Sequence, residues 1–120
     1  MKDSLISEGR KVVALVDRGF AEANVLFVDQ LLSKIAYLEV PSGESSKSVE
    51  WLSKGWDFLA SNKIDRTGVL FVLGGGVTGD LGGFLAASYL RGIDFVQFPT
   101  TLLAMVDSSG GGKTGLNLHA

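Results

Sequence analysis

Four short apolar runs recur along the chain, each rich in β-branched or aromatic residues and each followed by polar or turn-forming residues. They occupy residues 12–16, 35–40, 69–73 and 93–98. The runs at residues 12–16 and 69–73 are continuous, as is typical of strands that are buried on both faces in a parallel sheet. Longer segments with apolar residues at helical spacing separate them. The alternation predicts an α/β fold with a mostly parallel sheet and flanking helices.

The segments between these runs are expected to be helical, with two points left open. Residues 20–34 favour a helix, although residues 25–28 are also compatible with an extended conformation. Ser45 or Ser46 is expected to cap the next helix, because serine side chains accept hydrogen bonds from free N–H groups at helix starts. The apolar positions of that helix are Val49, Leu52, Trp56 and Leu59.

The remaining elements are a turn at residues 65–68 and a third helix over residues 84–90. Neither a helix nor a strand is expected after the glycine-rich stretch that ends at Gly115. A length of 120 residues suits one domain. We therefore expect residues 1–120 to form a single α/β domain that is truncated at both ends.

Composition excludes several classes of protein. Apolar residues make up 46% and charged residues 20% of the chain, and the net charge of −2 gives no attraction to nucleic acid or to an anionic membrane. Cysteine is absent, so disulfides and thiolate metal sites are excluded. The single histidine, His119, cannot complete a histidine-based metal site. No signal peptide or membrane span is recognisable, so a cytoplasmic location is expected.

Glycine is unusually frequent, with 16 residues of which most lie from Gly74 to Gly115. Gly74, Gly76 and Gly79 match the pattern G-x-G-x-x-G directly after a predicted strand, as in Rossmann-like dinucleotide-binding domains. The missing side chains let backbone N–H groups approach a pyrophosphate at the positive end of a helix. The alternative is a tight strand-to-helix turn that needs glycine only for close packing.

One feature of the usual dinucleotide site is missing. An acidic residue near the end of the next strand normally holds the ribose. Here that strand ends in Gln97, Phe98 and Pro99, with no carboxylate. Asp80 lies instead near the start of the predicted helix, where it either caps the helix or contacts a ribose from an unusual direction.

A second glycine-rich segment, residues 107–115, contains the Gly-Lys-Thr sequence that ends a phosphate-binding P-loop. Asp107 stands where that motif requires its first glycine, so the P-loop interpretation fails. Lys113 either meets a phosphate as a point charge or is a solvated lysine in a flexible surface loop.

Two further segments carry weaker signals. Residues 41–47 favour a turn into a helix, with Glu44 in a favourable position near the helix start. Thr100 and Thr101 follow a predicted strand directly, and hydroxyls at the carboxyl end of a strand can reach a ligand.

Taken together, these segments resemble the 3-dehydroquinate synthase family. The match is dense over residues 69–117 and looser over residues 12–47. Its elements are residues 74–84, 89–92, 98–104, 106–109 and 111–115, followed by Asn117. Other sugar-phosphate cyclases share the glycine signature but replace the Ser-Ser and Gly-Gly-Lys-Thr-Gly elements, so 3-dehydroquinate synthase is preferred.

The resemblance implies roles for individual residues. The catalytic residues that it implies are Asp107, Lys113, Arg91 and Asn117. The cofactor-binding residues that it implies are Asp17, Glu44, Lys47, Gly75, Gly76, Val77, Thr78, Gly79, Asp80, Thr100, Thr101 and Lys113. Asp17 and Asp80 would contact ribose hydroxyls, and Lys113 would meet the substrate phosphate. Arg91 would reach the substrate phosphate in a neighbouring subunit, which implies a homodimer.

The implied activity is that of a lyase of the shikimate pathway of aromatic amino-acid biosynthesis. It converts 3-deoxy-D-arabino-heptulosonate 7-phosphate into 3-dehydroquinate with loss of phosphate. The implied cofactors are NAD and a divalent metal, zinc or cobalt. Two alternatives stay open: an isolated nucleotide-binding module without turnover, and the NAD domain of another sugar-phosphate cyclase. Lys113 and its flanking glycines argue against a relative of the metal-dependent alcohol dehydrogenases.

The sequence departs from the family pattern in three ways. Gly110 stands where the family usually has valine, which is expected to loosen the loop that carries Lys113. The chain lacks the family's opening strands, and it ends at Ala120 before the helical C-terminal domain. Because that domain supplies the metal ligands, the isolated chain is expected to be inactive.

Overall fold

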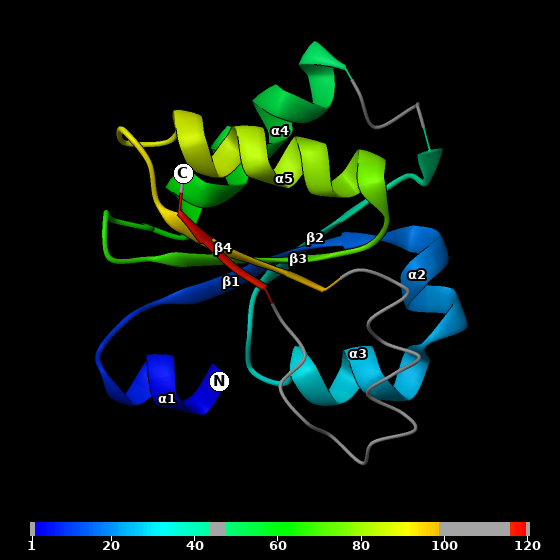
Figure 1. The fold of residues 1–120 in the computed structure, drawn as a ribbon, viewed down its shortest axis with the longest axis horizontal. Helices are drawn as coiled ribbons and strands as arrows, with labels where there is room; N and C mark the ends of the chain where they lie inside the picture. Colours follow the sequence, from blue (N-terminus) through cyan, green and yellow to red (C-terminus); the bar gives the residue numbers. More distant parts are fainter. Residues whose placement is uncertain (1, 44–47, 99–115, 120) are drawn as a thin grey trace.

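The computed structural model of the chain describes residues 2–43 and 48–98, together with the backbone of residues 116–119. The described residues form a five-stranded sheet with the strand order β2-β1-β3-β4-β5 (Figure 1). Its strands are β1 (Val12–Asp17), β2 (Tyr37–Val40), β3 (Val69–Leu73), β4 (Asp94–Phe98) and β5 (Leu116–His119). The predicted α/β fold with a Rossmann-like parallel sheet is confirmed.

The first four strands are parallel, and their register places buried apolar residues of neighbouring strands next to one another. Phe71 of β3 lies between Ala14 of β1 and Val96 of β4, and all three are buried. Strand β3 is buried at every position. Side chains on both faces of β1 and β3 are covered, which explains why residues 12–16 and 69–73 are continuously apolar rather than alternating.

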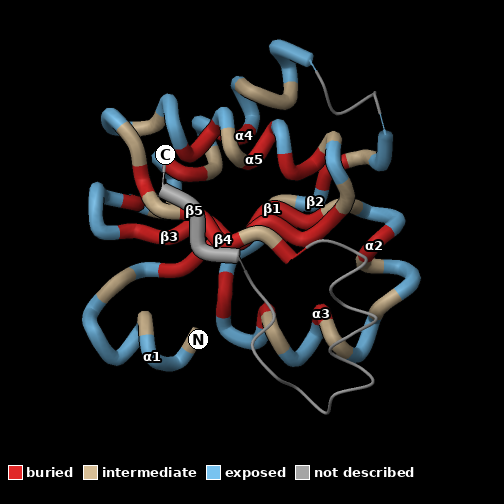
Figure 2. The backbone as a smooth tube through the Cα atoms, in the orientation of Figure 1, coloured by how far each residue is buried: buried red, intermediate tan, exposed pale blue. Residues whose placement is uncertain are grey.

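Helices cover both faces of the sheet. One face carries α1 (Lys2–Ser7), α2 (Arg18–Ala23) and α3 (Val25–Leu31), and the other carries α4 (Val49–Ser61) and α5 (Gly76–Ser88) (Figure 1). Two apolar cores result. Phe20 and Val28 pack against the first face, and Leu59 and Leu85 pack against the second. The buried residues follow the strands through the middle of the molecule (Figure 2).

The expectation of one helix over residues 20–34 is wrong, because Asn24 divides it into α2 and α3. Asn24 adopts φ −136° and ψ 47°, and its side-chain amide donates to the Phe20 carbonyl at 3.0 Å. An asparagine side chain that takes a backbone carbonyl in this way competes with the helical hydrogen bond. Residues 25–28 are helical, so the extended alternative is also wrong.

Helix α4 differs from its expected form in its cap and in its buried face. Its N-cap is Ser48, whose hydroxyl accepts from the Trp51 amide at 3.2 Å, whereas the expected caps Ser45 and Ser46 lie outside the described residues. Leu59 is fully buried as expected. Val49 and Trp56 are 80% and 37% exposed, so neither belongs to the buried face, where Gly55 lies against Leu85 of α5 instead.

Two other expectations are corrected. Helix α5 begins at Gly76 and not near Phe84, so the glycine-rich motif is itself the first turn of the helix. Strand β5 was not expected, yet it pairs antiparallel with β4, with Leu116 opposite Gln97. Its four residues are too few to give a periodic signal, and the pairing satisfies N–H and C=O groups along the outer edge of β4. The predicted turn at residues 65–68 is present, closed by a hydrogen bond from the Gly68 amide to the Asp65 carbonyl.

None of the helices in the described ranges combines the length and the apolar character that a bilayer crossing requires.

Close packing of α5 on the sheet gives a matched pair of substitutions. A Cβ atom at Gly82 would lie 2.5 Å from a methyl carbon of Val72, which is buried and stiff. We expect Gly82→Ala to lower the free energy of unfolding by about 1–3 kcal/mol, measured by chemical denaturation. At Gly83 the nearest atom would be 3.5 Å away, so Gly83→Ala should be neutral or stabilising by up to about 1 kcal/mol. Equal effects of the two changes would contradict this packing.

Candidate functional site

The candidate site lies at the carboxyl edge of the sheet, where β1 and β3 end side by side. The chain leaves β1 toward α2 on one face and leaves β3 toward α5 on the other face (Figure 1). Open α/β sheets bind their ligands outside such a topological switch point. Asp17 ends β1 and Gly74 follows β3. We call the region formed by Asp17 and residues 74–78 the switch-point site.

Asp17 is the centre of a hydrogen-bond network at this site. Its Oδ1 accepts from the Phe20 amide at 2.9 Å and from the Ser42 hydroxyl at 2.7 Å. Its Oδ2 accepts from the Thr78 hydroxyl at 3.1 Å. The carboxylate thereby caps α2 and joins it to the loop after β2 and to the first turn of α5. Its position and orientation are fixed by three separate segments.

The network also sets the charge of Asp17. Burial by itself would raise the pKa of this carboxyl, because it disfavours the charged form. The hydrogen bonds from Ser42, the Phe20 amide and Thr78 favour the charged form and outweigh burial, with a further contribution from the Gly19 amide. The pKa of Asp17 therefore lies below its ordinary value of 3.8, and the side chain is a fixed negative charge at neutral pH.

One glycine of the fingerprint is required by packing. Gly74 has φ +156°, and a Cβ atom there would lie 2.7 Å from the Cβ of Asp17 and 3.0 Å from that of Thr78. A Cβ atom at Gly79 would meet the amide group of Gln97, which is the end of a flexible side chain and can move aside. For Gly74, the alternative of a tight strand-to-helix turn with close packing is sufficient.

Gly75 and Gly76 are different. Among the described residues, a Cβ atom at either position would meet nothing within 4 Å, and neither residue has a positive φ. Glycine is a common N-cap residue, which suits Gly75, but at the first helical position it lowers helix stability, so packing against the described residues does not account for Gly76. Gly75 is the N-cap of α5 without a side-chain cap, and the first turn of the helix directs backbone N–H groups outward next to Asp17. A negatively charged group can therefore approach the backbone here.

Thr78 and Ser42 take roles that the sequence did not suggest. The resemblance placed Thr78 among the cofactor contacts, but its side chain is only 1% exposed and bonds to Asp17. Ser42 appeared only as part of a turn, and it proves to bond Asp17 and to accept from the Gly19 amide at 3.0 Å. The signal that could have found it is topological, since Ser42 follows the strand next to β1 and parallel strands end at one edge.

Asp80 lies at the margin of the site. The capping alternative is wrong, because the N-cap of α5 is Gly75 and Asp80 falls in the second turn. The Asp80 side chain is exposed and borders an apolar pocket of about 350 Å³ between α4 and α5, which Leu52 and Phe84 also line. Its contact with a ribose stays a prediction.

The other expected site residues fall into two groups. Glu44, Lys47, Thr100, Thr101, Asp107 and Lys113 lie outside the described residues, as does Gly110. Asn117 lies in β5 opposite Val96, and Arg91 is exposed in the connection between α5 and β4. Because α5 runs back across the sheet, Arg91 lies at the edge opposite the switch-point site. A helix of 13 residues separates these two edges by about 20 Å.

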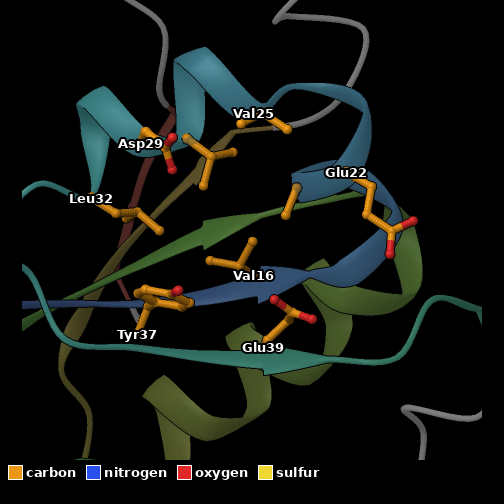
Figure 3. Close-up of a pocket in the computed structure, with 9 residues that line it drawn as sticks. Val16, Glu22, Val25, Asp29, Leu32, Tyr37 and Glu39 are labelled. Carbon is orange, nitrogen blue, oxygen red and sulfur yellow. The ribbon is translucent and has the colours of Figure 1, made fainter.

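A further pocket, of about 280 Å³, lies on the face of the sheet that carries α2 and α3 (Figure 3). Val16 and Leu32 form its apolar part, while Glu22, Asp29 and Glu39 bring carboxylates to it. Glu39 is paired with Arg18 at 2.8 Å. Nowhere in the described part of the chain do three carboxylate or imidazole groups gather closely enough to hold a metal ion.

Comparison with known proteins identifies relatives of this domain. Residues 37–120 match the family model described as 3-dehydroquinate synthase N-terminal. A 3-dehydroquinate synthase of Opitutus terrae is 53% identical over 97% of this chain and 32% of its own length. One of Desulforamulus reducens is 45% identical over 91% of this chain and 32% of its own length. The chain thus spans about a third of the curated relatives it matches.

Solved structures of two other enzymes share the fold. A 2-deoxy-scyllo-inosose synthase, complexed with carbaglucose-6-phosphate, NAD⁺ and Co²⁺, matches with a TM-score of 0.66 and 26% identity, over 82% of this chain and 28% of its own. A 2-epi-5-epi-valiolone synthase of Streptomyces hygroscopicus, with NAD⁺ and Zn²⁺ bound, matches in fold with a TM-score of 0.64 and 24% identity, over 82% of this chain and 29% of its own.

The Asp17 network leads to a prediction about pH. We expect Ser42→Ala to raise the pKa of Asp17 toward its ordinary value of 3.8, because the hydroxyl that favours the charged form is removed. Since the folded-state pKa of Asp17 is depressed, its contribution to stability is present above about pH 4 and is lost as the pH falls through that pKa. Ser42→Ala should therefore cost about 1 kcal/mol at neutral pH and less in acid.

An NMR titration of side-chain carboxyl carbons measures this pKa. Asp65 is the internal reference, since its pKa is lowered by hydrogen bonds from Thr67 at the other edge of the sheet. A pKa of Asp17 that does not move in Ser42→Ala, with Asp65 unchanged, would contradict the network.

Proposed function

The chain belongs to the family of 3-dehydroquinate synthase N-terminal domains, and on this premise we propose that residues 1–120 are the NAD-binding domain of a 3-dehydroquinate synthase. The proposed reaction converts 3-deoxy-D-arabino-heptulosonate 7-phosphate into 3-dehydroquinate with loss of phosphate. The proposal includes a cytoplasmic location and a homodimer. The observation that carries it is the pair Gly75 and Gly76, whose missing side chains leave open space at a helix start beside a fixed carboxylate.

The switch-point site matches the two chemical parts of a dinucleotide. A pyrophosphate is anionic and suits the amides of Gly76 and Val77 at the positive end of α5. Ribose hydroxyls are donors and suit the charged carboxylate of Asp17, which three hydrogen bonds hold in place. A pyrophosphate alone would not need the Asp17 carboxylate, and a ribose alone would not need the open helix start. This combination supports NAD over a simple anion as the ligand.

The remaining cofactor contacts follow from the resemblance. Asp80 would approach a ribose from the second turn of α5, and Glu44 and Lys47 would lie around the adenosine portion. Thr100 and Thr101 follow β4, whose last residue Phe98 accepts a hydrogen bond from the Gly74 amide at 3.3 Å. Strand β4 therefore ends next to the switch-point site, two residues before Thr100 in the sequence, which supports the assignment of both threonines.

The bound NAD would supply reversible oxidation of a substrate hydroxyl, which acidifies the neighbouring C–H and allows phosphate to leave. The residues of this chain orient the reactants and hold charge. Lys113 would bind the substrate phosphate, Asp107 would accept a hydrogen bond from a substrate hydroxyl, and Asn117 would complete this set. The described residues offer no metal site, and no role in binding the divalent metal is assigned to them.

The place of Arg91 supports the homodimer. It lies at the edge of the sheet opposite the switch-point site, so one copy of the domain cannot bring both to one ligand. A second copy that packs against this edge would supply Arg91 to a neighbouring site, where the resemblance gives it the substrate phosphate to bind. Arginine suits this task because its planar fork binds phosphate through two hydrogen bonds.

The two alternatives have less support. An isolated nucleotide-binding module would explain the switch-point site but not the resemblance over residues 99–117. Another sugar-phosphate cyclase would share the fold and the cofactor. The relatives that match nearly the whole chain are named 3-dehydroquinate synthases, and they are more similar to it than the cyclases of known structure.

Gly76→Ala tests the cofactor site without disturbing the described part of the fold, because a Cβ atom there meets no described residue within 4 Å. The test protein is a full-length chimera in which this chain replaces the matching third of the Opitutus terrae relative. We expect calorimetry to show NAD binding at least about tenfold weaker, while the melting temperature is unchanged or higher. Gly83→Ala, in the same helix but away from the site, is the control and should leave NAD affinity unchanged. Unchanged affinity in Gly76→Ala would mean that the turn is purely structural.

Lys113→Ala and Arg91→Ala in the chimera test the substrate site. Each should lower kcat/KM for phosphate release by about 10- to 100-fold, the loss of one charge-assisted interaction, while NAD affinity is retained. If Arg91 acts in a neighbouring subunit, mixing the two impaired variants should raise the activity above that of either alone, because a mixed dimer contains one site with both residues intact. No gain in activity after subunit exchange would place Lys113 and Arg91 in the same subunit's site.

A further inference from the structure

The connection between α5 and β4 is a tight turn with an unusual conformation. The Gly92 amide donates to the Tyr89 carbonyl at 2.8 Å, so residues 89–92 form a β-turn. Its two central residues, Leu90 and Arg91, have φ values of +48° and +67°. Positive φ at both central positions defines a type I′ turn, which normally carries asparagine, aspartate or glycine there. Leucine and arginine adopt this conformation only against steric repulsion from their own Cβ atoms.

Hydrogen bonds on both sides hold the turn in place. The Tyr89 amide donates to the Leu85 carbonyl at 3.0 Å, and the Ile93 amide donates to the Ala86 carbonyl at 2.9 Å. The Tyr89 hydroxyl donates to the Ile64 carbonyl at 2.8 Å, across to the segment that precedes β3. A backbone in a sparsely populated conformation persists only where its surroundings fix it. Of these hydrogen bonds, the one from the Tyr89 hydroxyl is the only one that reaches a segment distant in the sequence.

The stability of the domain does not explain the residues in the turn. Leu90 is 46% exposed, and Arg91 is exposed without a hydrogen bond or ion pair to any described residue. Asparagine or glycine would make the same connection without the repulsion. What the turn achieves is to hold the exposed Arg91 at a fixed point of the sheet edge.

We infer that Tyr89 is a positioning residue: its bond to Ile64 fixes the strained turn that presents Arg91 to the phosphate of a substrate bound by a second copy of the chain. This inference rests on the proposed function, which gives Arg91 its target. It adds the means by which the domain orients the side chain of Arg91, which makes no hydrogen bond or ion pair to a described residue.

The experiment uses the full-length chimera and measures the KM for the phosphate-bearing substrate, the affinity for NAD and the melting temperature. Tyr89→Phe removes only the hydroxyl, and it should raise the KM by about five- to tenfold without a change in NAD affinity. Tyr37→Phe is the matched control, because it removes a hydroxyl from the exposed Tyr37 of β2, and it should change none of the three quantities.

A rescue separates positioning from general support of the fold. Leu90→Asn places in the turn a residue that tolerates positive φ, so the type I′ conformation should persist without the Tyr89 anchor. Added to Tyr89→Phe, it should bring the KM back to within about threefold of the parent value. Alone it should raise the melting temperature and leave the KM unchanged.

The outcomes distinguish this inference from the proposed function. If Arg91→Ala leaves the KM unchanged, the role of Arg91 fails and the inference fails with it. If Arg91→Ala raises the KM but Tyr89→Phe does not, only the inference is overturned. If Tyr89→Phe weakens substrate and NAD binding alike and Leu90→Asn gives no rescue, the hydroxyl supports the fold in general and the inference is again overturned.

Discussion

The carboxylate of Asp17 is the interaction on which the arrangement of this domain depends. It receives hydrogen bonds from the start of α2, the loop after β2 and the first turn of α5, which belong to opposite faces of the sheet. The backbone around it has to come close, and Gly74 lacks a side chain for this reason. The same bonds keep Asp17 charged, so one network fixes the fold at the switch point and prepares the site for a ligand.

The glycines from Gly74 to Gly79 differ in what surrounds them. A side chain at Gly74 is excluded by Asp17 and Thr78, whereas one at Gly75 or Gly76 would meet no described residue. The sequence pattern cannot separate these glycines, because Asp17, which excludes a side chain at Gly74, belongs to another strand. The structural interpretation is sufficient for Gly74, and the binding roles of Gly75, Gly76 and Gly79 stay predictions.

How much the sequence predicts depends on how local the cause is. Strands β1 and β3 were predictable, because burial on both faces gives each of them an uninterrupted apolar run, and β2 and β4 were predictable because apolar residues dominate them. The helix break at Asn24 and the helix cap at Ser48 each depend on a single side-chain hydrogen bond. Along the sequence, a continuous helix through Asn24 and a cap at Ser45 or Ser46 are equally plausible. Ser42 and Thr78 were not predictable as partners of Asp17, since 25 and 61 residues of chain separate them from it and only the parallel register brings them together.

Strand β5 has a consequence for the segment that precedes it. Residues 99–115 begin directly after Phe98 of β4 and end directly before Leu116 of β5, and the two strands are hydrogen-bonded neighbours. The pairing places Leu116 opposite Gln97, so the two described residues that flank this segment, Phe98 and Leu116, lie close together on the sheet. The entropy of closing a connection depends only weakly on its length, at about 0.6 kcal/mol for each doubling. The pairing of β4 with β5 therefore tolerates changes in the number of residues between the two strands at little cost in folding free energy.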